Sequence, residues 1–123
     1  GNYRLAWYAA PQRSAQTIPA RATLETAVQL PPGSIVCGIS GSSSQAAGFQ
    51  LQLVEARTRE QFFSTNQDFR NCTGQPGQPG FPVHRLPQFH QVLNPGLVNV
   101  QIVNQAASAA EIEVVLWVAQ PAA

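Results

Sequence analysis

Apolar and polar residues alternate with a period of two along several short segments, and this alternation is the feature that most restricts the fold of the chain. The clearest segments are residues 22–30, 49–54, 98–104 and 112–119. Successive side chains of a β-strand point to opposite sides of a sheet, so each segment is predicted to be a strand with one buried face. Turn-forming sequences such as Pro31-Pro32-Gly33 and Asn94-Pro95-Gly96 separate these segments from their neighbours.

Shorter apolar runs add further strands. Residues 35–39 are predicted to form a strand that ends in a flexible Gly/Ser loop at 40–44, and residues 60–65 are favoured as a strand over a short helix. Residues 83–86 and 89–93 are expected at sheet edges, because Pro87 between them has no backbone N–H to donate a hydrogen bond to a neighbouring strand. The fold predicted is an all-β, single-domain, jelly-roll-like β-sandwich of seven or eight short antiparallel strands, with a small closed barrel as the competing architecture.

The two ends of the chain contain the aromatic residues that are expected at an interface. Residues 1–15 are predicted to be an N-terminal arm or docking strand, and residues 16–123 the sandwich, with a Gly/Pro-rich loop at 73–82. In the last strand the second face is unusually apolar, so Trp117 and its neighbour Val115 are expected to be covered by another strand layer, the N-terminal segment or a partner. The residues expected at an interface are Tyr3, Trp7, Tyr8 and Trp117.

Charge is scarce in this sequence. Seven Lys or Arg, all of them Arg, and six Asp or Glu give 11% charged residues and a net charge of +1. Duplex binding needs a concentrated basic face, so nucleic acid is not expected as a partner. Arg57 and Arg59 are expected to share one strand face that is solvated or ion-paired with Glu55 and Glu60, rather than holding a phosphate. No apolar run is long enough for a membrane span, so no membrane association is expected.

No motif in the sequence points to catalysis. Gly38-Ile39-Ser40-Gly41-Ser42 lacks the second glycine of a nucleophile elbow. His84 and His90 are the only imidazoles, too few for a metal site with recognised spacing. Cys37 and Cys72 are expected to be free thiols rather than a disulfide. We therefore expect no catalytic residues, no cofactor and no metal, and a protein that is not an enzyme.

Two stretches of the chain resemble a known family type. The run Leu24 to Ile39, with its Leu30-Pro31-Pro32-Gly33-Ser34 turn, and residues 94–104 leading to Glu113-Val114-Val115-Leu116-Trp117-Val118 resemble jelly-roll virion proteins of tailed bacteriophages, in particular small capsid decoration (cement) proteins. The resemblance implies a homotrimer bound to a major capsid protein or another virion protein. It also implies a location on the capsid surface, after synthesis in the host cytoplasm.

A second function class fits the same fold. In a carbohydrate-binding or receptor-binding sandwich, for example in a phage tail appendage, exposed Trp or Tyr side chains stack on sugar rings while Gln and Asn bind hydroxyl groups. A glycan is then the expected partner, and Trp7 and Trp117 are the side chains whose loss would abolish binding.

Overall fold

The computed structural model of the chain describes residues 3–10, 16–69, 84–92 and 96–122. The predicted loop at 73–82 and Cys72 lie outside these residues. The described part contains the following strands: β1 (Tyr3–Ala10), β2 (Gln16–Ile18), β3 (Thr23–Gln29), β4 (Ile35–Ser43), β5 (Phe49–Glu55), β6 (Gln67–Asp68), β7 (His84–Gln91), β8 (Leu97–Asn104) and β9 (Ala110–Pro121).

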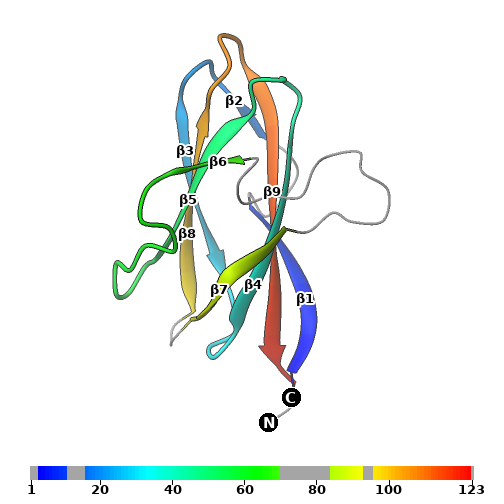
Figure 1. Cartoon of the computed structure of the whole chain (residues 1–123), viewed down its shortest axis with the longest axis vertical. Coiled ribbons are helices and arrows are strands. Elements are labelled where there is room, and N and C mark those ends of the chain that lie inside the picture. The colour runs from blue at the N-terminus through cyan, green and yellow to red at the C-terminus, as the bar shows by residue number, and fades with distance from the viewer. Residues whose placement is uncertain (1–2, 11–15, 70–83, 93–95, 123) are drawn as a thin grey trace.

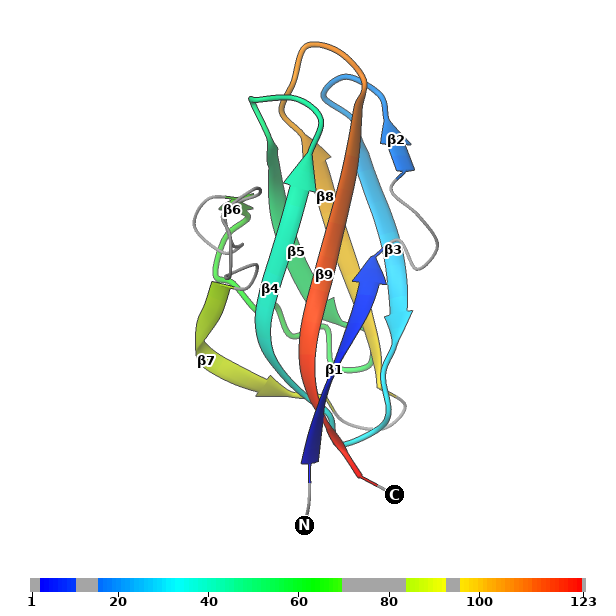
Figure 2. The same cartoon turned by 90° about the vertical axis from the view of Figure 1, so that its right-hand side faces the viewer.

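The strands form two antiparallel sheets that pack face to face (Figures 1 and 2). Sheet A has the order β1-β9-β4-β7, with β2 also paired to β9, and sheet B has the order β3-β8-β5-β6. The chain changes sheet at every step from β2 onward except between β5 and β6, and the first and last strands are neighbours. This is the strand order of a jelly roll, which confirms the predicted fold class.

β1 and β2 act as one interrupted edge strand. β1 pairs with β9 from Tyr3↔Pro121 to Ala10↔Val114, and β2 continues along the same strand from Gln16↔Ile112. Residues 11–15 separate the two pieces. Counted in this way the sandwich has eight strands, and the segment predicted as an N-terminal arm contributes its first strand, β1, to sheet A.

The core lies between the sheets and consists of the side chains that the alternation predicted to point inward. Sheet B contributes Phe49, Leu51 and Leu53 from β5 and the alternate apolar residues of β8, all fully buried. Sheet A contributes every second residue of β9, from Ile112 to Val118. Burial of such side chains is the main favourable term in folding, at about 25 cal/mol per Å² of apolar surface.

Three local predictions were wrong. Residues 40–43 are not a flexible loop; they extend β4, and Ser40 to Ser43 pair with Val115 to Ile112 of β9. Residues 60–65 form no strand beyond an isolated bridge between Gln61 and Val54. Arg57 and Arg59 lie in the turn after β5 rather than on a strand face, and Arg59 adopts a φ of 62°.

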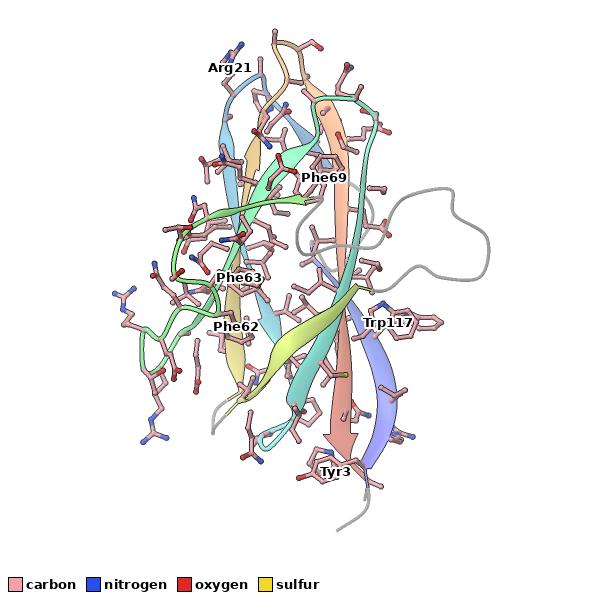
Figure 3. The ribbon with its side chains drawn as sticks, in the orientation of Figure 1. Tyr3, Arg21, Phe62, Phe63, Phe69 and Trp117 are labelled. Atoms are coloured by element: carbon pink, nitrogen blue, oxygen red, sulfur yellow. The ribbon has the colours of Figure 1, made fainter. Side chains whose placement is uncertain are left out.

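The connection after β5 folds back over the outer face of sheet B. The Gln52 side chain, predicted to face solvent, is 1% exposed because this connection covers it. Its amide nitrogen donates to the carbonyl oxygen of Phe63 at 2.9 Å, and its amide oxygen accepts from the Phe63 N–H at 3.2 Å. Figure 3 shows Phe62 and Phe63 on this side of the sandwich, opposite Trp117.

Candidate functional site on the outer face of sheet A

The outer face of sheet A carries the exposed aromatic residues of the chain's first strand. Residues directly opposite each other in an antiparallel pair point to the same side. The register of β1 and β9 therefore places Tyr3, Leu5 and Trp7 beside Pro121, Ala119 and Trp117, while the alternate residues of β9 enter the core. Tyr3, Leu5 and Trp7 are 48%, 68% and 66% exposed.

The exposure of these three residues shows which face of β1 is the inner one. Their alternation with Arg4 and Ala6 predicts a strand with one buried face, but the buried and half-buried side chains lie on the other face of β1, at Ala6, Tyr8 and Ala10. β1 lies close to β3 of the opposite sheet. The inner face therefore combines two alanines with Tyr8, whose hydroxyl reaches the side-chain amide of Gln120.

Trp7 and Trp117 meet across the β1–β9 pair. Their ring centroids are 5.2 Å apart and their planes are inclined at 66°, an edge-to-face contact of the kind aromatic quadrupoles favour. The Trp117 Nε1–H donates to the Ser40 Oγ on β4 at 3.3 Å. The backbone oxygen of Trp117 also accepts from the Cys37 Sγ at 3.3 Å. These contacts hold the Trp117 side chain outside the sheet, where Figure 3 shows it.

An open hollow of about 380 Å³ adjoins this pair. Apolar area dominates its lining, and its polar groups come from two neighbouring strands of the same sheet. The lining residues are Trp7, Ser40, Glu113, Val115 and Trp117. The volume lies at the small end of the range for ligand pockets, about 300–1,000 Å³. Two indole rings, one hydroxyl and one carboxylate thus converge on a space that suits a small polar ligand with an apolar face.

Tyr8 is separated from the other three residues predicted at an interface. It is half-buried on the inner face of β1, and its hydroxyl contacts the side-chain amide of Gln120. With its oxygen toward Arg4, that amide accepts from the Arg4 Nε at 3.0 Å and Nη2 at 3.1 Å while its nitrogen donates to Tyr8. This orientation gives every group a partner. Tyr8 and Arg4 thereby attach β1 to β9 through a buried amide.

Sequence reasoning singled out three of the hollow's five residues, Trp7, Val115 and Trp117. It missed Ser40, which it assigned to a loop, and Glu113, which it placed on the outer face of the last strand without a role. The alternation in β9 does put Glu113, Val115 and Trp117 on one face. The register that brings β1 and β4 beside that face comes only from the structure.

The described residues contain no group of three or more His, Cys, Asp or Glu side chains placed to hold a metal. The side chains of His84 and His90 lie outside the described ones, as does Cys72, so the predictions about a metal site and a disulfide stay predictions. No helix in the described segments has the length and hydropathy needed to cross a membrane. Comparison with protein-family models, curated proteins and solved structures finds no match for this chain.

Proposed function

We propose that this protein is a non-enzymatic structural subunit that binds to a larger particle, as capsid decoration (cement) proteins do. The observation that carries the proposal is the apolar end of sheet A, formed by the exposed Tyr3 and Leu5 of β1 with the half-buried Ala119 and the exposed Pro121 of β9. We call these four residues the docking end. Contiguous exposed apolar side chains are a feature of interaction sites, because water contact with them is unfavourable.

The polar part of the surface supports the same proposal. Only 11% of the residues are charged, and glutamine, asparagine and serine provide much of the remaining polarity. Covering neutral polar groups with a partner requires no desolvation of ions, so the cost of burial is modest when hydrogen bonds are restored. A surface of this type suits permanent contact with like or unlike subunits.

Under this proposal the partners are a second and third copy of the chain and a major capsid protein or another virion protein. The protein acts on the capsid surface and resides in the host cytoplasm before assembly. Each docking end contributes a weak contact, and repetition of that contact over a symmetric lattice multiplies its effect on the stability of the particle.

The test compares particles assembled with and without the chain. We expect particles that lack it to form but to break at lower temperature or smaller osmotic steps. A Leu5→Ala, Tyr3→Ala double variant should unfold at the same denaturant concentration as the natural chain yet fail to co-sediment with the particles. A Thr23→Ala, Gln29→Ala variant, changed at exposed positions of β3 in sheet B, is the matched control. Equal robustness of the two kinds of particle would reject the proposal.

A further inference from the structure

The hollow beside Trp7 and Trp117 has an apolar side and a polar side, whereas the docking end is formed by apolar residues and Tyr3. Its apolar walls are the two indole rings, of Trp7 on β1 and Trp117 on β9. Its polar groups are Ser40 on β4 and Glu113 on β9, and the lining is completed by Val115, which lies opposite Ser40 in the β4–β9 register. We propose that this hollow binds one pyranose ring of a glycan, as a site distinct from the docking end.

A sugar ring matches this division. A pyranose has a face of C–H groups that packs on an aromatic ring and an edge of hydroxyl groups that requires hydrogen-bond partners. The Glu113 carboxylate accepts hydrogen bonds from up to two hydroxyls, and Ser40, whose oxygen already accepts from Trp117, still has an O–H to donate. Ser42 lies opposite Glu113 on the neighbouring strand and adds a hydroxyl to the same edge.

The aromatic wall is formed before any ligand arrives. The hydrogen bond to Ser40 and the edge contact with Trp7 limit the rotamers of Trp117. Trp7 is anchored by its strand pairing with β9 and still exposes two-thirds of its surface. A preformed platform lowers the entropy cost of binding, which matters most for a weak, single-ring ligand.

A cationic ligand is the main competitor, because indole rings and a carboxylate also attract ammonium groups. Recognition of such cations relies on several ring faces turned toward one point. Here the two indole rings contact each other edge to face with centroids 5.2 Å apart, so they leave no space for a cation between them. The two serine hydroxyls likewise suit a neutral polyol better than a cation.

The two tryptophans allow a direct test with ¹⁵N-labelled full-length chain. Methyl pyranosides of glucose, galactose, mannose and N-acetylglucosamine are titrated to about 50 mM, because single-ring sites have dissociation constants on the order of millimolar. At least one sugar should shift both indole N–H resonances in a saturable manner. Trp7→Ala should weaken that sugar's affinity by about tenfold or more, since about 60 Å² of apolar contact is lost.

Matched variants separate this site from charge effects and from docking. Glu113→Gln should weaken sugar binding, whereas Glu111→Gln, on the same strand and outside the hollow, should not. Tyr3→Ala should leave sugar affinity unchanged while impairing attachment to particles. Indole resonances that stay fixed with every sugar would overturn the proposal. So would shifts with tetramethylammonium chloride in place of sugars, which would assign the hollow to a cation.

Discussion

At the residue scale, one buried asparagine links two loops of the sandwich. Asn104, at the end of β8, is fully buried, and its Nδ2 donates to the carbonyl oxygens of Ile18, Pro19 and Ser108 at 3.0–3.2 Å. Its Oδ1 accepts from the Ala106 N–H at 2.9 Å. A single amide therefore satisfies four backbone groups where the chain enters β3 and leaves β8.

Replacing Asn104 with alanine should destabilise the protein by about 2–4 kcal/mol, because buried donors and acceptors left without partners each cost about 1 kcal/mol or more. Denaturant unfolding followed by tryptophan fluorescence measures the effect as a lower midpoint with an unchanged slope. Asn99→Ala, on the outer face of the same strand, is the control and should change stability by less than about 0.5 kcal/mol. Equal effects of the two variants would contradict this role.

Gly48, just before β5, is a second single-residue constraint. Its φ is +69°, and a Cβ atom at this position would overlap the ring of Phe69, which packs against Phe49 with centroids 5.2 Å apart. Gly48→Ala should cost about 2–5 kcal/mol, from about 1–2 for the left-handed backbone and about 1–3 for the overlap. Gly33 also has a positive φ, but a Cβ atom added there by Gly33→Ala would approach only the Pro121 side chain, at 3.5 Å. A difference in unfolding midpoint between the two variants isolates the packing contribution, and its absence would refute it.

At the scale of elements, alternation predicted most of the strands because a period of two is a local property. β3, β5, β8 and β9 lie within two residues of their predicted limits, with their apolar faces inside. Alternation does not specify the neighbours of a strand. The segment 40–43 has the composition of a loop, yet it is ordered because β9 offers it backbone partners on the far side from β1.

The same limit explains the candidate site. Both faces of β1 contain apolar residues, so alternation alone does not decide which face is buried; the structure turns Ala6, Tyr8 and Ala10 inward. The sequence predicted the N-terminal segment as one of three alternatives that could cover Trp117, and Trp7 of β1 contacts it. Their contact, and the addition of Ser40 and Glu113, depend on two strand registers that join segments about 75 to 110 residues apart.

The sheet order also predicts where the fold opens first. β9 is paired on both sides, by β1 and β4, and β8 by β3 and β5, whereas β6 and β7 are end strands in the described order. Amides in β8 and β9 should therefore exchange with deuterium at least about 100-fold more slowly than those in β6 and β7, as local openings cost less at sheet edges. Mass spectrometry of exchanged peptides measures this ranking. Slower exchange in β7 than in β9 would contradict the pairing.

At the scale of the whole molecule, the low charge makes a prediction about how copies associate. With a net charge of +1, long-range electrostatic attraction or repulsion between copies is small, and apolar contact is left as the main driving force for the proposed trimer. Raising NaCl from about 50 to 500 mM shortens the screening length severalfold but should change the dissociation constant by less than about threefold. Sulfate at equal ionic strength should strengthen association, because it favours burial of apolar surface. Sedimentation equilibrium measures both effects.

Leu5→Ala and Thr23→Ala distinguish the docking end from the rest of the surface, since only the first removes exposed apolar area from sheet A. A chain that stays monomeric at every concentration, or a trimer that dissociates in salt, would show that the exposed apolar face of β1 does not direct self-association.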